Sequence, residues 1–151
     1  MKSKKYDIIF LSLARNCEGS LKFFFNFLKE LKNQGNEVFS IIGENGSEDY
    51  TFDEIVKFEN QNKDLITFLD TTFIEKFSDR IIRLSKARQF LKDYILKQNI
   101  ECNYLCVIDV DDVLSKKFTT DDFYKIKNEL DNNENELFAV SVKSTPFYYD
   151  I

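Results

Sequence analysis

The feature that most constrains this chain is a short apolar run that ends in three carboxylates. The run covers residues 104–108, contains aromatic and β-branched side chains, and is followed by Asp109, Asp111 and Asp112. Such a run, closed by a polar turn, predicts a buried strand. The end of the strand would place the carboxylates together at the edge of a sheet, where they repel each other unless a cation lies among them. Mg²⁺ and Mn²⁺ take oxygen ligands and often share such sites with substrate phosphates, so the pattern indicates metal-assisted phosphate chemistry.

A simpler interpretation of the same carboxylates is a solvated turn or the cap of a following helix. An Asp-x-Asp pattern on its own is common and carries little information. Two further observations favour the metal site here: the strand that precedes it and the polar segments that occur upstream.

The composition restricts the classes of function. With 151 residues and 43% hydrophobic residues, the chain is expected to form a single domain or one piece of a larger one. Its net charge of −5 disfavours non-specific binding to nucleic acid or to acidic membrane surfaces. The absence of histidine excludes Ser-His-Asp and Cys-His mechanisms within these residues. Three cysteines without a Cys-x-x-Cys pattern predict free thiols in a reducing compartment.

No signal peptide or membrane-spanning segment is evident in the sequence, because its apolar runs are short. We therefore expect a cytoplasmic protein, either free or peripheral to a membrane.

Apolar runs of strand length alternate with amphipathic segments along the chain. Strands are predicted at residues 6–13, 37–42, 65–69, 103–108 and 137–142, and a further one is predicted to open at 147–151. Helices are predicted to start at Ser20, near Thr51, after Ser78, and after Thr119 or Thr120. This order predicts an α/β fold, a Rossmann-like three-layer sandwich with a mostly parallel central sheet.

Two of the predicted helices carry apolar stripes. The first runs to about residue 34, with Gly35 past its end, and its core-facing positions are Leu21, Phe24, Phe25, Leu28 and Leu31. The helix after Ser78 is expected to direct its own stripe toward the core, at Ile81, Leu84, Leu91 and Ile95.

Polar residues follow three of the predicted strands. Arg15 and Asn16 follow the first, residues 43–49 form a polar loop after the second, and the carboxylates follow the fourth. Ligands of open α/β sheets bind outside the carboxyl ends of the strands, so these segments predict a nucleotide cleft. Neither Gly-x-Gly-x-x-Gly nor a Walker loop is present, which disfavours a Rossmann dehydrogenase and a P-loop NTPase.

A basic cluster stands out in this acidic chain, at residues 80–88. Arg83 and Arg88 are offset by about 140° on an ideal helix, so the cluster cannot point at one ligand as a whole. One or two of its members can pair with phosphates or with the acidic loop. A solvated basic face is the alternative.

Taken in order, these motifs resemble those of the GT-A glycosyltransferases over residues 6–142. The similar motifs are Arg15-Asn16 after the first strand, the acidic loop from Glu44 to Thr51, and Asp109-Val-Asp111. The Arg80-x-x-Arg83-Leu-Ser-x-x-Arg88 segment is similar to a helix in the fungal capsule-associated mannosyltransferases, where Asn usually stands in place of Gln89. The acidic loop also has one residue more before Thr51 than the family pattern.

The resemblance implies a glycosyltransferase that takes a UDP- or GDP-sugar donor, an unknown glycan, lipid or protein acceptor, and Mn²⁺ or Mg²⁺. Asp111 would ligate the metal, and Asp109 the metal or the ribose. Glu44 and Asn45 would lie near the base and ribose, with Arg15 and Asn16 at the pocket floor. Arg83 or Arg88 would offset the pyrophosphate charge. The implied nucleotide-sugar-binding residues are Arg15, Asn16, Glu44, Asn45, Ser47, Arg83, Arg88 and Asp109.

The second half of a GT-A domain, with its acceptor pocket and any catalytic base, has no counterpart here, so we expect a donor-binding part and assign no base. Two alternatives stay open. One is a non-catalytic or degenerate nucleotide-binding module. The other is a haloacid-dehalogenase-like phosphatase, in which Asp109 is the nucleophile and Asp111 the acid/base; its first motif resembles residues 109–114, but it leaves the preceding residues unexplained.

Overall fold

The computed structural model describes residues 4–110 and 119–133. Residues Met1–Lys117 form one compact unit and residues Phe118–Ile151 a second. The described elements of the first unit are β1 (Lys4–Ala14), α1 (Glu18–Asn33), β2 (Val38–Glu44), α2 (Thr51–Gln61), β3 (Ile66–Asp70), the 3₁₀ helix η1 (Thr72–Lys76), α3 (Arg80–Lys97) and β4 (Ile100–Val107). The second unit contributes one described helix, α5 (Thr120–Asn132).

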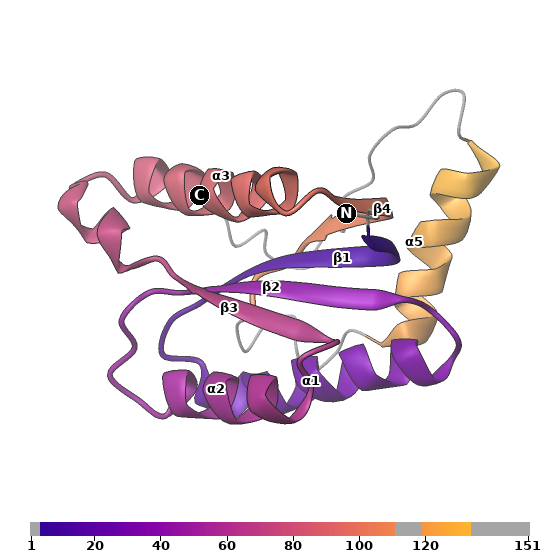
Figure 1. The fold of residues 1–151 in the computed structure, drawn as a ribbon, viewed down its shortest axis with the longest axis horizontal. Helices are drawn as coiled ribbons and strands as arrows, with labels where there is room; N and C mark the ends of the chain where they lie inside the picture. The colour runs from indigo at the N-terminus through magenta and orange to yellow at the C-terminus, as the bar shows by residue number, and fades with distance from the viewer. Residues whose placement is uncertain (1–3, 111–118, 134–151) are drawn as a thin grey trace, which may run out of the picture. The chain divides into compact units, whose positions relative to one another are not determined.

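The four strands form one parallel sheet in the order β3-β2-β1-β4. Figure 1 shows α1 and α2 on one face of this sheet and α3 on the other. The predicted Rossmann-like α/β fold is therefore confirmed for the described part of the chain. The connection from β3 to β4 runs through α3 and places β4 next to β1, on the opposite side of β1 from β2. The strand order therefore changes direction between β1 and β4, and the carboxyl ends of these two strands form a topological switch point.

Each face of the sheet has its own apolar core. On the α3 face, the buried residues are Tyr6, Ile9, Leu11, Phe39, Ile41, Leu91 and Ile95. On the other face, Phe10 of β1 meets the edges of Phe24 and Phe27 from α1, and Phe25 of α1 stacks on Phe58 of α2. The predicted stripe of α1 is buried throughout, as expected for a helix that packs on a sheet.

Two helix ends, the C-terminus of α1 and the N-terminus of α5, have the capping residues that the sequence predicted. At the end of α1, Gly35 adopts φ 91°, and the amides of Gly35 and Asn36 donate to the carbonyls of Lys32 and Leu31. This is the Schellman arrangement that a glycine in this position favours. Thr119 caps α5 and forms a reciprocal capping box with Asp122, so one of the two predicted caps is confirmed.

Several local predictions need correction. Ser20 and Ser78 were expected as helix caps, but α1 begins after Cys17 and α3 begins after Asp79, whose carboxylate accepts from the amide of Ile82. The polar loop was expected from residue 43, but β2 continues through Glu44 because both residues still pair with neighbouring strands.

Two expectations about burial are also wrong. Ile81 was placed in the core but is 75% exposed. The strand before the carboxylates was expected to be buried, yet β4 is an edge strand of the described sheet, and Leu105 and Val107 are about half exposed. The predicted strands at 137–142 and 147–151 lie outside the described residues.

Candidate functional site

The carboxyl ends of all four strands contribute to one cavity of about 260 Å³, on the α3 side of the sheet. Its polar lining includes three arginines, one amide and one carboxylate. We call it the arginine pocket, and its lining residues are Leu13, Ala14, Arg15, Asn45, Thr71, Ile74, Arg80, Arg83, Leu84 and Asp109. Its position at the strand ends is where ligands of open α/β sheets bind.

The helical repeat of α3 explains why two arginines enter this pocket. Arg80 and Arg83 lie on the same side of the helix as Ala87 and Leu91, which are fully buried against the sheet. At the first turn of α3 this inward side faces the cavity at the strand ends. The inward positions of the first turn therefore hold arginines, whereas the inward positions later in the helix hold core residues.

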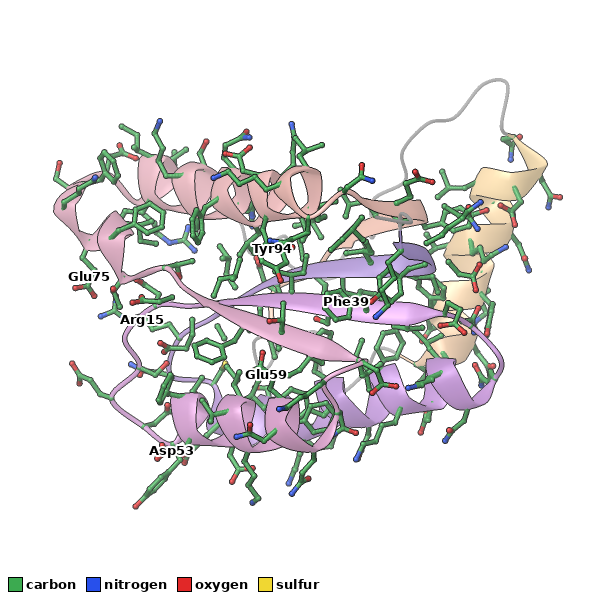
Figure 2. The ribbon with its side chains drawn as sticks, viewed as in Figure 1. Arg15, Phe39, Asp53, Glu59, Glu75 and Tyr94 are labelled. Carbon is green, nitrogen blue, oxygen red and sulfur yellow. The ribbon has the colours of Figure 1, made fainter. Side chains whose placement is uncertain are left out.

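The pocket is positively charged. Arg15 is paired with Glu75, with 3.6 Å between its Nη2 and the carboxylate Oε1, and Figure 2 shows the two side chains together at this end of the sheet. Within the described residues, Arg80 and Arg83 have no ion pair. Two guanidinium groups are thus available to an anionic ligand, and arginine is well suited to bind phosphate oxygens.

Asn45 brings the opposite kind of group to the same cavity. Its backbone amide donates to the carbonyl of Ala14 at 3.2 Å, which fixes the residue between the ends of β1 and β2. Its side-chain Oδ1 is buried and accepts no hydrogen bond from the described residues. A buried acceptor without a donor is unfavourable by about 1–3 kcal/mol, so the site suits a ligand that donates a hydrogen bond at this point.

Asp109 is held by the third arginine of α3. The Nη2 of Arg88 lies 3.3 and 3.2 Å from the two carboxylate oxygens of Asp109, and both side chains are about 40% exposed. The Nε of Arg88 is buried and, within the described residues, unpartnered. The basic cluster was expected to pair with phosphates or with the acidic loop, but Arg88 pairs with Asp109 instead, and this pair sets the position of the Asp109 carboxylate at the rim of the pocket.

A second arrangement at this end of the sheet joins the loops after β1 and β2. Backbone amides of one loop donate to side chains of the other, in both directions. We call this the inter-loop network, and its bonds are Asn16 N–H to Ser47 Oγ (3.0 Å), Cys17 N–H to Thr51 Oγ1 (2.7 Å), Glu18 N–H to Asp49 Oδ2 (3.2 Å), Glu48 N–H to Asn16 Oδ1 (2.8 Å) and Tyr50 N–H to Glu18 Oε2 (2.9 Å).

This network caps two helices at once. Cys17 and Glu18 stand at the start of α1, where amides have no partner within the helix, and Thr51 and Asp49 supply the acceptors. Glu18 in turn accepts from Tyr50 at the start of α2. Acceptors from a distant loop take the place of the predicted cap Ser20, which is why α1 begins earlier than its sequence suggests.

The network also affects the charge of Asp49. Burial raises the pKa of its carboxyl group, but hydrogen bonds from Thr51 and from the backbone of Glu18 outweigh this, and the pKa lies below its usual range. The carboxylate of Glu44 is likewise engaged: it accepts from the amides of Gly46 (3.1 Å) and Ser47 (2.7 Å) and holds the loop closed.

The sequence-predicted site residues thus separate into two groups. Arg15, Asn45, Arg83 and Asp109 come together in the arginine pocket, with Arg88 beside Asp109. Asn16 and Ser47 take part in the inter-loop network, and Glu44 closes the loop. The ligand contacts expected of these last three residues stay predictions.

Sequence reasoning missed Thr71, Ile74 and Arg80 as pocket residues. Thr71 follows β3, a fourth strand end that was not considered, and its hydroxyl donates to the carbonyl of Glu44 at 2.7 Å. Arg80 was noted in the basic cluster but not assigned to a site. Its spacing of seven residues from the buried Ala87 was the signal that could have placed it on the inward side.

The predicted metal site is only partly described. Asp111 and Asp112 lie outside the described residues, which contain no cluster of three or more side chains suited to hold a metal ion. Asp109 is the carboxylate that the described residues offer at the pocket, and a divalent cation needs more oxygen ligands than one side chain gives. The assignment of Mn²⁺ or Mg²⁺ therefore stays a prediction that depends on Asp111.

Comparison with known proteins identifies no family. No family model matches the chain, and no curated protein is detectably similar to it. In the described ranges, no helix is both long and apolar enough to cross a membrane.

Proposed function

We propose that this chain binds a nucleotide-sugar donor, a UDP- or GDP-sugar, in the arginine pocket and is part of a metal-dependent glycosyltransferase. The observation that carries the proposal is that one cavity at the strand ends contains both free guanidinium groups and the unpartnered Oδ1 of Asn45. The ligand must supply anionic acceptors and a hydrogen-bond donor together. A nucleotide-sugar has both, in its diphosphate and in its hydroxyl or base N–H groups.

The size of the cavity limits how the donor binds. Its volume of about 260 Å³ is just below the usual range for pockets that enclose a whole ligand, roughly 300–1,000 Å³. The pocket therefore encloses one part of the donor, and the rest extends along the strand ends. Aliphatic side chains of Leu13, Ile74 and Leu84 line it together with the charged groups, which suits a part with both apolar and polar surface.

The residues of the chain would bind and orient the donor. Arg80 and Arg83 would offset its negative charge, and Arg88 would hold the Asp109 carboxylate in place. Mn²⁺ or Mg²⁺ ligated by Asp109 and Asp111, when bound, would stabilise the diphosphate as a leaving group. The acceptor would be a glycan, a lipid or a protein.

Calorimetric titration of UDP and GDP, with and without Mn²⁺, tests this proposal. We expect binding that Arg83→Gln weakens by about ten- to a hundredfold, because a charge-assisted hydrogen bond contributes about 1.5–3 kcal/mol. Lys97→Gln, an exposed cation in the last turn of the same helix, is the matched control and should bind as the parent does. Asp111→Asn should remove the dependence on Mn²⁺. A folded parent that binds neither nucleotide contradicts the proposal.

A nucleotide-binding module without turnover is the second candidate. It is favoured by the engagement of Asp109 with Arg88, which occupies the one described carboxylate of the pocket. The two candidates differ in a single assay, the release of UDP or GDP from the corresponding nucleotide-sugar in the presence of Mn²⁺. Release at a rate above the background, lost in Asp109→Asn, supports the transferase; tight binding without release supports the module.

A further inference from the structure

The first turn of α3 exposes two adjacent isoleucines. Ile81 is 75% exposed and Ile82 is 46% exposed, although the chain is acidic and most of its large apolar side chains are buried. They lie about 100° apart around the helix, so they cover its outer side at this turn without belonging to the buried stripe. Together they form a small apolar patch, and an apolar patch rimmed by polar residues can mark an interaction site.

Most of the charged residues near the isoleucines are cations, and Asp79, the cap of α3, is their acidic neighbour. Every charged residue of α3 from its start to Lys92 is a cation, namely Arg80, Arg83, Lys86, Arg88 and Lys92. Arg88 is paired with Asp109, and the others have no ion pair within the described residues. This segment is thus positively charged, although the chain as a whole has a net charge of −5. A surface that combines exposed apolar groups with cations complements a negatively charged, partly apolar partner.

The spacing of the apolar residues argues for a lipid surface over a protein groove. A helix that docks in a groove presents anchors at i, i+3 or i+4, and i+7 along one side. The outward positions of α3 that follow Ile82 are instead polar, at Ser85, Lys86 and Gln89, and all three are exposed. A single apolar turn with Lys86 on its outward side, and with Arg80 and Arg83 at the edge of the pocket, suits shallow insertion among lipid headgroups, where long basic side chains reach the phosphates.

We propose that the first turn of α3 docks this protein on anionic membrane surfaces, with Ile81 and Ile82 inserted at the headgroup level and Lys86 and neighbouring cations contacting lipid phosphates. The arginine pocket opens beside the same turn, since Arg80, Arg83 and Leu84 line it. Docking here would bring the pocket close to the membrane. The inference does not depend on which ligand the pocket binds.

Sedimentation with lipid vesicles tests the proposal. Vesicles of phosphatidylcholine with about one third phosphatidylglycerol should carry the protein down, and pure phosphatidylcholine vesicles should not, because each cation near an anionic surface adds to the binding. Raised salt should release the protein, since the Debye length shortens. The double variant Ile81→Ser/Ile82→Ser should bind about tenfold more weakly, because the inserted apolar area is lost.

Leu96→Ser is the matched control, because Leu96 is 67% exposed on the same helix but lies near its other end. It should sediment as the parent does. Circular dichroism and UDP titration of the double variant, whose substituted side chains are not pocket residues, separate loss of docking from loss of fold or of ligand binding.

The proposal is overturned if anionic vesicles do not sediment the parent, if pure phosphatidylcholine vesicles sediment it equally well, or if Leu96→Ser weakens binding as much as the double variant. Failure of the nucleotide titrations would leave it standing, because vesicle sedimentation does not require a ligand in the pocket.

Discussion

The inter-loop network and the arginine pocket lie at the same end of the sheet, but they use polar groups in different ways. In the network, backbone amides at the start of α1 meet acceptors from the opposite loop, and the side chains of Asn16 and Glu18 return the bonds. In the pocket, Oδ1 of Asn45 and two guanidinium groups have no partner among the described residues. Satisfied groups stabilise a fold, and unsatisfied groups are retained where a ligand supplies the partner. The difference indicates that the inter-loop network supports the fold and that the arginine pocket is free to bind a ligand.

The largest effect is expected from removing the buried hydrogen bond between Thr51 and the Cys17 amide, which tests whether the inter-loop network supports the fold. Thr51→Val removes the acceptor of the Cys17 amide and should lower the free energy of unfolding by about 2 kcal/mol, because the buried N–H loses its partner. Urea denaturation measures the change. Thr51→Ser keeps the hydroxyl and serves as the control. Equal stability of the two variants would show that the network contributes little to the fold.

Gly43 tests the packing beneath both regions. A Cβ at this position would lie 2.8 Å from Leu13 and 2.9 Å from Thr71, two residues of the pocket wall, so Gly43→Ala should destabilise the protein by about 1–2 kcal/mol. Gly19→Ala is the matched substitution, since no atom lies within 4 Å of its added Cβ and alanine favours the helix. Thermal unfolding should rank Gly19→Ala above the parent and Gly43→Ala below it; the reverse order would contradict the packing argument.

Two asparagines give the most direct comparison between the regions. Asn16 accepts from Glu48 and adopts φ 50°, which asparagine tolerates better than alanine, so Asn16→Ala should lower stability by about 1 kcal/mol. Asn45→Ala removes a buried acceptor that has no donor, so stability should stay the same or rise by up to about 1–3 kcal/mol, while affinity for the bound nucleotide falls. Urea denaturation and calorimetric titration of both variants check this. A loss of stability in Asn45→Ala larger than in Asn16→Ala would reverse the assignment of roles.

The smallest expected effect is the response of the network to acid. The pKa of Asp49 is lowered in the folded protein, so its carboxylate stabilises the fold above the unfolded-state pKa, and this contribution disappears as the pH falls through the lower, folded-state value. The parent should therefore lose stability between about pH 5 and pH 3 more steeply than Asp49→Asn does. Urea midpoints across this range measure the two slopes. Parallel curves would mean that another carboxyl group causes the acid response.

The sequence was sufficient to predict the elements whose cause is local. The strands around Ile9 and Ile41 follow from short apolar runs, α1 from its apolar repeat and Gly35, and α5 from the cap at Thr119. Periodicity and capping depend on neighbours within a few residues, and these are visible in one dimension. The alternation of such elements was enough to predict a parallel α/β sheet.

Local reasoning failed where the deciding partner is distant in the chain. The start of α1 depends on Asp49 and Thr51, more than thirty residues away, and no pattern around Ser20 reveals them. Ile81 continues the apolar repeat of α3 but belongs to a turn at the end of the sheet, where that side of the helix is left exposed.

For the candidate site, the sequence by itself determined that polar residues gather at the ends of the strands. It did not determine what each residue does there. Asn16 follows Arg15 directly, yet Asn16 joins the inter-loop network and Arg15 lines the pocket; Asn45 and Ser47 separate in the same way. Only the tertiary structure made this division, because a side chain is held or left free by the donors and acceptors around it, and these come from other strands and from α3.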